Sequence, residues 1–121
     1  MDKIRAAVIG VGYLGRFHAQ KYAQATQCEL TAVCDSRQEA RERVAAEVGT
    51  RPVADYRQLL GTVDAVSVVT PTPAHYRIAR EFLESGAHVL VEKPITETPA
   101  EARALIDLAA RGERVLQVGH L

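Results

Sequence analysis

The sequence has no excess of charge of either sign. Its 121 residues contain 15 lysines and arginines and 15 aspartates and glutamates, so the formal net charge is zero. Proteins that attract nucleic acid or an anionic membrane through electrostatics carry an excess or a cluster of basic side chains. The balanced charge gives no electrostatic reason to expect binding to nucleic acid or to an anionic membrane. We therefore expect neither among the partners of this chain.

Long apolar runs are also missing, and cysteine is scarce. No stretch approaches the roughly 20 apolar residues of a membrane-spanning helix. The opening residues, Met1 to Arg5, lack the apolar core of a secretory signal. Cys28 and Cys34 flank a predicted strand over 29–34, which would hold the two thiols too far apart for a disulfide. We therefore expect reduced thiols in a cytoplasmic protein, and we expect no metal site.

The chain does contain a regular alternation of apolar strands and amphipathic helices. No linker, low-complexity segment or repeat beyond this alternation interrupts the 121 residues, a length that suits one domain. Such an alternation, with right-handed crossovers, predicts a doubly wound parallel α/β sheet of about six strands in the order 3-2-1-4-5-6. Strands are expected at 4–9, 29–34, 51–54, 65–69, 88–91 and 115–118, helices at 13–25, 37–48, 74–85 and 99–110, and a short helical turn at 56–60.

Three glycines follow the first strand: Gly10, Gly12 and Gly15 are spaced G-x-G-x-x-G, with Tyr13 and Leu14 inside the motif. The first glycine permits a tight turn, the second lets the backbone approach a pyrophosphate, and the third lets the helix lie close to the strand. The helix then directs free N–H groups and the positive end of its dipole at the anion. Strand, motif and helix in this order predict a Rossmann-type dinucleotide site that includes these five residues.

Asp35 closes the second predicted strand, 20 residues after Gly15. A carboxylate there accepts hydrogen bonds from the adenosine ribose and repels a 2′-phosphate, so the sequence favours NAD over NADP. The next two residues, Ser36 and Arg37, are expected at the same site, and the Arg37 guanidinium can instead pair with a 2′-phosphate, which leaves NADP possible. Asp35 can also cap the following helix, a role compatible with ribose binding.

Two histidines lie on helices near the same edge of the predicted sheet. His18 falls on the inward stripe of the first helix, where we expect a hydrogen bond to neighbouring backbone, with a cofactor contact as the alternative. His75 starts the helix after the fourth strand, on the side that faces the strand ends. Ligands of open parallel sheets bind beyond the carboxyl ends of the strands. The residues expected to share this crevice are Gly10–Gly15, Asp35, Thr70, Lys93 and His120.

Three stretches resemble the glucose–fructose oxidoreductase and inositol dehydrogenase family of NAD(P)-dependent oxidoreductases. They are GVGYLGRFHA at 10–19, TPTPAHYRIA at 70–79 and GAHVLVEKPIT at 86–96. The resemblance spans essentially the whole chain, and the G-x-H-V-L-V-E-K-P run is the most particular to this family. It implies that Lys93 approaches the nicotinamide and the substrate, with Glu92 beside it. Thr72 stands where the family has an asparagine, so this chain lacks the side-chain amide of that asparagine. The residues implied to lie along the cofactor after the fourth strand are Thr70, Pro71 and Thr72, and His75 is expected at the same site from its position on the helix.

The same resemblance implies a second domain, which supplies most substrate contacts and a catalytic Asp/His pair in this family. Residues 1–121 are then expected to be the dinucleotide-binding half of a homo-oligomeric enzyme. It would transfer hydride between NAD, or NADP, and a sugar, cyclitol or similar polyol, and this half alone would be inactive. Lys93 would polarise or deprotonate the substrate hydroxyl; alternatively it pairs with Glu92 or faces solvent. Two other functions stay open, a non-catalytic NAD-sensing module and a domain for S-adenosylmethionine.

Overall fold

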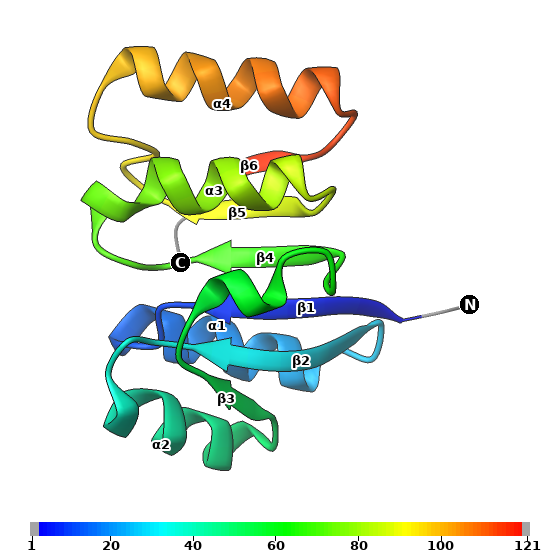
Figure 1. Cartoon of the computed structure of the whole chain (residues 1–121). Coiled ribbons are helices and arrows are strands. Elements are labelled where there is room, and N and C mark those ends of the chain that lie inside the picture. Colours follow the sequence, from blue (N-terminus) through cyan, green and yellow to red (C-terminus); the bar gives the residue numbers. More distant parts are fainter. Residues whose placement is uncertain (1–2, 120–121) are drawn as a thin grey trace.

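The structure, a computed structural model, describes residues 3–119 and contains a six-stranded parallel sheet (Figure 1). The order of its strands is β3-β2-β1-β4-β5-β6, which confirms the predicted doubly wound fold and its topology. Element ends differ from the predictions by only a residue or two; Cys28, for example, opens the second strand instead of preceding it. The strands are β1 (Ile4–Ile9), β2 (Cys28–Cys34), β3 (Arg51–Val53), β4 (Ala65–Val68), β5 (His88–Glu92) and β6 (Leu116–Gly119).

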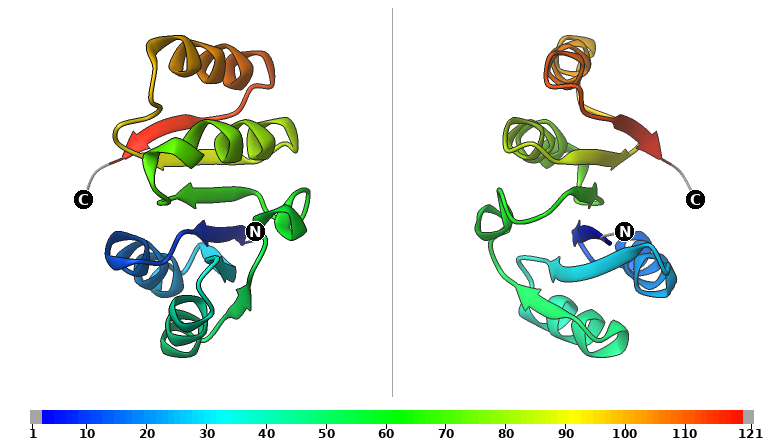
Figure 2. Two further views of the ribbon diagram at one scale, coloured as in Figure 1. Left: turned by 60° about the vertical axis from the view of Figure 1, so that its left-hand side comes forward. Right: turned by 90° about the vertical axis from the view of Figure 1, so that its right-hand side faces the viewer.

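Helices cover both faces of the sheet. In Figure 2, α1 (Tyr13–Gln24) and α2 (Gln38–Val48) lie on one face, and α3 (His75–Glu84) and α4 (Pro99–Arg111) lie on the other. Two short 3₁₀ turns, η1 (Tyr56–Leu59) and η2 (Thr72–Ala74), belong to the connections around β4. This arrangement follows from the crossovers between parallel strands, which return over one face or the other of the sheet.

Two hydrophobic cores result, one on each face of the sheet. Residues on the central strand β1 alternate between them: Ala7 and Ile9 pack in the core beneath α3 and α4, whereas Val8 packs in the core beneath α1 and α2. A strand that is buried on both faces needs a continuous apolar run, which is why residues 6–9 read AAVI. The largest buried side chain, Phe82 of α3, fills the first of these cores.

The register of the sheet brings the carboxyl ends of its central strands together. Ile9 pairs with Cys34 on one side and with Val68 on the other, and Val68 pairs with Val91. The segments that follow β1, β2, β4 and β5 therefore leave the sheet at one edge, where the arrowheads lie together in Figure 1. The sequence motifs that bear chemistry are all in these segments.

Candidate functional site

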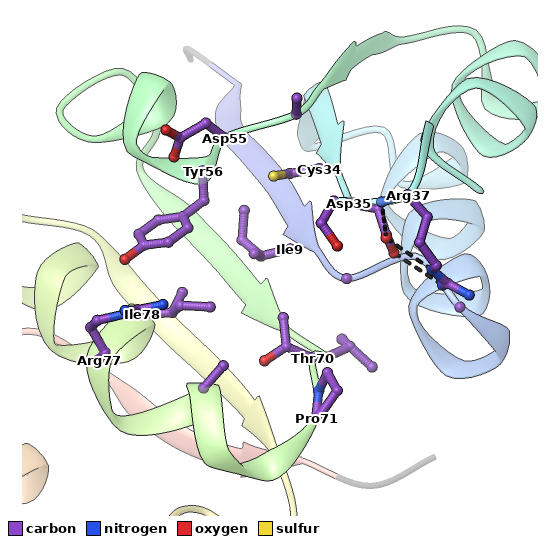
Figure 3. A pocket seen from close by; sticks show the side chains of 16 residues that line it. Ile9, Cys34, Asp35, Arg37, Asp55, Tyr56, Thr70, Pro71, Arg77 and Ile78 are labelled. Atoms are coloured by element: carbon purple, nitrogen blue, oxygen red, sulfur yellow. Dashed lines mark hydrogen bonds and ion pairs between the residues drawn. The ribbon is translucent and has the colours of Figure 1, made fainter. Parts of the chain in front are cut away.

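A cavity of about 940 Å³ opens at this edge of the sheet (Figure 3). Its walls come from the ends of β1, β2 and β4, from the segment after β3, and from the first turns of α3. The lining residues are Ile9, Gly10, Gly12, Cys34, Asp35, Ser36, Arg37, Ala54, Asp55, Tyr56, Val69, Thr70, Pro71, Ala74, Arg77 and Ile78. The sequence predicts one crevice shared by Gly10–Gly15, Asp35, Thr70, Lys93 and His120. The structure places Gly10, Gly12, Asp35 and Thr70 along this cavity, whereas Lys93 is not among its lining residues.

The glycine turn is built so that only two of its three glycines are required by packing. Gly10 has φ +92°, and a Cβ there would lie 2.7 Å from the carbonyl of Val69; a Cβ on Gly15 would lie 1.7 Å from the Gly10 oxygen. A Cβ on Gly12 would meet only the Arg37 guanidinium, at 3.5 Å. Packing thus explains Gly10 and Gly15, whereas the space in front of Gly12 is free for a ligand to approach the backbone.

Helix α1 begins directly behind this turn. Gly12 is its N-cap and supplies no side chain to bond the first N–H groups, and the first turn carries no acidic residue. These N–H groups and the positive end of the helix dipole are suited to a phosphate. Tyr13 and Leu14, which the motif predicted at the cofactor, are exposed and do not line the main cavity; Tyr13 lines a smaller hollow beside it, together with Gly12 and Arg37.

The Asp35 carboxylate is held in place by main-chain and side-chain donors. The Val11 N–H donates to its Oδ2 at 3.0 Å, and the Arg37 N–H donates to its Oδ1 at 2.9 Å. The Arg37 guanidinium adds a two-pronged contact, shown by the dashed lines in Figure 3. Burial disfavours the charged form, but these hydrogen bonds from Arg37 and Val11 outweigh it and hold the pKa of Asp35 below its usual value. Asp35 is therefore ionised at neutral pH, at the wall of the cavity.

Thr70 provides a second polar group at the cavity. Its Oγ1 is buried and finds no hydrogen-bond partner among residues 3–119. A buried hydroxyl without a partner is costly, so such an atom indicates a ligand or water that completes it. Pro71 also lines the cavity, whereas Thr72, which starts η2, does not. The glycine cradle, the ionised Asp35 and the unpaired Thr70 hydroxyl together fit a dinucleotide with phosphates and ribose hydroxyls.

His75 is 2% exposed and turns away from the cavity. Its Nε2 lies 2.8 Å from the Thr70 carbonyl oxygen, and its Nδ1 lies 2.9 Å from the Pro94 carbonyl oxygen. The ring thus joins the turn after β4 to the segment after β5. The structure gives His75 a connecting position behind the turn, and its predicted contact with a cofactor stays a prediction.

Glu92, at the end of β5, points toward α1 instead of the cavity. His18 Nε2 lies 2.8 Å from the Glu92 carboxylate, and both side chains are buried. His18 Nδ1 lies 3.0 Å from Ser67 Oγ, and the Tyr22 hydroxyl lies 2.7 Å from the same oxygen. The position of His18 on the inward stripe predicts a hydrogen bond to neighbouring backbone, but its partners in the structure are side chains from β4 and β5. The reason is that Ser67 and Glu92 face α1 from the sheet.

This buried chain contains the serine, histidine and acid of a hydrolytic triad, but it cannot work as one. Ser67 is 0% exposed, so its oxygen is out of reach of any substrate. Cys34, which lines the cavity, is equally unsuited to attack a substrate. Burial, followed by the negative charge of Asp35, raises the pKa of its thiol to about 12, so the thiol stays protonated. Both cysteines are free, as the sequence predicted.

Lys93 follows β5 immediately and is exposed. Among residues 3–119 it forms no ion pair, and the carboxylate of Glu92 is bound to His18 instead. The predicted alternative of a Lys93–Glu92 pair is therefore not formed. Ser36 and Arg37 line the cavity as predicted, whereas His120 lies outside the described residues.

Three residues of the cavity wall with charged or phenolic side chains were not predicted from the sequence. Segment 51–60 was assigned no chemistry, yet Asp55 and Tyr56 from this segment line the cavity, and so does Arg77 of α3. The same rule that identified Asp35 could have found Asp55 and Tyr56, because they follow the carboxyl end of a strand in the same sheet. Arg77 comes near only because α3 packs across the end of β4, a contact that the sequence pattern does not display.

The described part of the chain offers neither a metal-binding cluster nor a membrane-spanning helix. Residues 3–119 hold no group of three or more His, Cys, Asp or Glu residues able to bind a metal ion. Within the same range, the structure has no helix of the length and apolar character needed to cross a membrane.

Comparison with known proteins identifies the family. Residues 4–120 match the model of the oxidoreductase family with an NAD-binding Rossmann fold. The UDP-N-acetylglucosamine 3-dehydrogenase of Acidithiobacillus ferrooxidans is 47% identical over 121 residues, which are 100% of this chain and 38% of the relative. The D-glucoside 3-dehydrogenase of Escherichia coli is 38% identical over 117 residues, 93% of this chain and 33% of the relative.

Solved structures agree with the sequence matches. The Acidithiobacillus enzyme superposes with a TM-score of 0.92 over 99% of this chain and 39% of that chain. GenD2 from gentamicin A biosynthesis, in complex with NAD, superposes with a TM-score of 0.94 at 30% identity, over 98% of this chain and 35% of that chain. The chain thus spans little more than a third of the relatives that it matches. It belongs to the Gfo/Idh/MocA family of oxidoreductases, as their NAD-binding Rossmann domain.

Proposed function

We propose that this chain is the cofactor-binding part of an oxidoreductase that transfers hydride between NAD and a sugar or similar polyol. The observation that carries the proposal is the ionised Asp35 beside a glycine turn whose Gly12 leaves room for a phosphate. Two relatives support the substrate class, since their names describe dehydrogenases of UDP-N-acetylglucosamine and of D-glucosides. We also propose a cytoplasmic, homo-oligomeric protein; the two free thiols support the compartment.

In this proposal each group at the cavity has a separate part in holding NAD. The N–H groups at the start of α1 and the glycine turn bind the pyrophosphate, Asp35 accepts the adenosine ribose hydroxyls, and Thr70 supplies its unpaired hydroxyl. When bound, the nicotinamide accepts or donates the hydride. The remaining requirement is a group that handles the proton of the substrate hydroxyl, and this chain offers Lys93 beyond the end of β5.

Titration of the 121-residue chain with NADH tests the proposal. We expect saturable binding of NADH, weaker than in an enzyme with a second domain to close over the nicotinamide, and no preference for S-adenosylmethionine. Asp35→Ala should weaken NADH binding by about 1–3 kcal/mol, the range for losing hydrogen bonds to a charged group, and should move the preference toward NADPH.

A matched control for this substitution is Asp64→Ala. Asp64 also binds an arginine, Arg5, but at the amino ends of the strands, away from the cavity. It should leave NADH affinity unchanged. Tighter binding of S-adenosylmethionine than of NADH by the wild-type chain would contradict the dehydrogenase assignment. Equal loss of NADH affinity in Asp35→Ala and Asp64→Ala would show that Asp35 has no specific role.

A further inference from the structure

The segment 92–94 leaves the sheet at the carboxyl end of β5 and carries Lys93 at its centre. The pairing between β4 and β5 ends at Val68 and Val91, one residue before this segment. Lys93 is exposed, and a lysine side chain is a flexible stem of four carbons. The place that its ammonium group can reach therefore depends on how firmly the main chain around position 93 is held.

His18 holds the residue before Lys93. Its Nε2 lies 2.8 Å from the Glu92 carboxylate, and its Nδ1 lies 3.0 Å from Ser67 Oγ on β4. The three side chains are buried, so water does not compete for these hydrogen bonds. The imidazole thus ties Glu92 to β4 from the face of the sheet that α1 covers.

His75 holds the residue after Lys93, from the opposite face of the sheet. Helices α1 and α3 lie on different faces (Figure 2). The His75 Nδ1 lies 2.9 Å from the Pro94 carbonyl oxygen, and the Nε2 lies 2.8 Å from the Thr70 carbonyl oxygen. A carbonyl oxygen only accepts, so the link to Pro94 requires a proton on Nδ1. The ring thus ties Pro94 to the turn after β4, which also carries the unpaired Thr70 hydroxyl at the cavity.

Two buried histidines therefore fix the two neighbours of Lys93, and both reach back to β4 or to the turn that follows it. Neither histidine lines the cavity. Their effect on a bound cofactor would have to pass through Glu92 and Pro94, and so through the position of Lys93.

We propose that His18 and His75 are positioning residues for Lys93, an inference that rests on the proposed function, in which Lys93 handles the proton of the substrate hydroxyl. Together they hold the main chain at 92–94 so that the ammonium group lies at the nicotinamide end of the cofactor. Loss of either link lets this segment shift and spreads the ammonium group over a larger volume. The phosphate and ribose contacts at the glycine turn and Asp35 stay as they are.

The two redox forms of the cofactor report the place of the ammonium group. The nicotinamide ring of NAD⁺ is positively charged and that of NADH is neutral, so an ammonium group held beside the ring disfavours NAD⁺ alone. The quantity to measure in the 121-residue chain is the ratio of the Kd of NAD⁺ to the Kd of NADH. In Lys93→Ala this ratio should fall by about two- to threefold at low salt, as expected for two unit charges about 6–8 Å apart in water.

Asparagine and glutamine variants of the two histidines test the positioning role. An asparagine amide nitrogen takes the place of Nδ1, and a glutamine amide nitrogen takes the place of Nε2. His75→Asn keeps the donor to Pro94 and should keep the wild-type ratio, whereas His75→Gln should lower it to the value of Lys93→Ala. At position 18 the order is reversed: His18→Gln keeps the donor to Glu92 and the ratio, and His18→Asn loses both.

This crossed pattern distinguishes positioning from general loosening of the fold. A variant that only destabilises the chain weakens NAD⁺ and NADH binding alike and leaves the ratio unchanged. The matched control is His88, at the other end of β5, whose Nδ1 accepts a hydrogen bond from the Val115 N–H at 2.9 Å. His88→Asn and His88→Gln should both keep the wild-type ratio.

The outcomes separate the positioning role from the proposed function. A wild-type chain that binds neither NAD⁺ nor NADH contradicts the proposed function. A chain that binds both, with the wild-type ratio in His75→Gln and His18→Asn, contradicts only the positioning role. An unchanged ratio in Lys93→Ala would also overturn it, because the ammonium group would not lie beside the nicotinamide.

Discussion

Asp35 and Glu92 are both acidic residues at the carboxyl edge of the sheet, but their surroundings differ. Asp35 turns to the cavity, where its side-chain donor is an exposed arginine that a ligand can replace. Glu92 turns to α1, where its partner is the buried His18. An exposed ion pair contributes little to stability, whereas leaving a buried acid without its hydrogen-bond partner is costly. Asp35 can therefore exchange its partner for a ligand, whereas Glu92 is held within the fold.

His18→Leu tests the structural part of this contrast. The substitution leaves the buried Glu92 side chain without its hydrogen-bond partner, so the free energy of unfolding should fall by about 1–3 kcal/mol, the range for a buried polar group left unsatisfied. Urea denaturation measures the change. His18→Leu combined with Glu92→Leu should recover much of the loss, because no unsatisfied polar group remains.

The control for this prediction is an exposed pair on α2, Glu39 with Arg43. Glu39→Ala should change the free energy of unfolding by less than about 1 kcal/mol. If His18→Leu were no more destabilising than this control, the hydrogen bond between His18 and Glu92 would not contribute to the fold.

At the scale of elements, helix α1 connects the fold to the site. Its first turn approaches the end of β1 so closely that a side chain at position 15 would overlap the Gly10 carbonyl. The same turn leaves open space at Gly12, in front of the first N–H groups of the helix. One glycine of the motif therefore allows the helix to pack on the strand, and another leaves the space that the proposed ligand needs.

Alanine substitutions should separate these two effects. Gly15→Ala should lower the free energy of unfolding by about 3 kcal/mol or more, because α1 has to move away from β1. Gly12→Ala should leave stability within about 0.5 kcal/mol and reduce NADH affinity at least about tenfold, because the new methyl group occupies the approach of the pyrophosphate. Thermal denaturation and NADH titration of both variants give the comparison; a Gly12→Ala chain that binds NADH normally would rule out the predicted pyrophosphate position.

The parallel register of the sheet brings the ends of distant segments together at one edge. Asp35, Thr70 and Lys93 are far apart in the sequence, and each follows the carboxyl end of a strand. His75 adds a link between two of these segments through the carbonyl groups of Thr70 and Pro94. The wall beyond Lys93 that would hold a sugar is expected from a second domain.

Lys93→Ala tests whether this chain binds the cofactor without Lys93 and needs Lys93 only for turnover together with the proposed second domain. In the 121-residue chain the substitution should barely change the Kd of NADH, because the phosphate and ribose contacts are untouched. In a protein that includes the proposed second domain, it should cut turnover by about 10²–10⁴-fold, the usual scale for losing a positioned acid–base group. Steady-state kinetics and NADH titration measure the two effects.

Two results would contradict the proposal for Lys93 and for the half-enzyme. Measured polyol dehydrogenase activity of the 121-residue chain would show that no second domain is needed. An unchanged rate for Lys93→Ala in the longer protein, together with intact NADH binding, would favour a lysine that merely faces solvent, and a sensing module would then become the better reading of the site.

The elements, the topology and the edge of the sheet proposed to hold the cofactor can all be predicted from the amino-acid sequence. Apolar runs such as 6–9 and 65–69 mark strands buried on both faces, and right-handed crossovers leave few ways to arrange them. The placement of the three glycines and Asp35 at one edge can then be predicted from their positions in the sequence. Both come directly after strands, and the carboxyl ends of these strands share one edge of the sheet. Local pattern and general topology are sufficient for these predictions.

What each side chain at that edge faces depends instead on packing between elements. Whether Glu92 points to the cavity or to α1 depends on the pleat of β5 and on His18, which lies 74 residues earlier in the chain. Contacts between elements also bury His75 and bring Arg77 and Tyr56 into the cavity wall. They likewise determine which groups donate hydrogen bonds to Asp35. A periodic pattern shows which face of an element is apolar, but side-chain partners are set by packing between segments that are distant in the sequence.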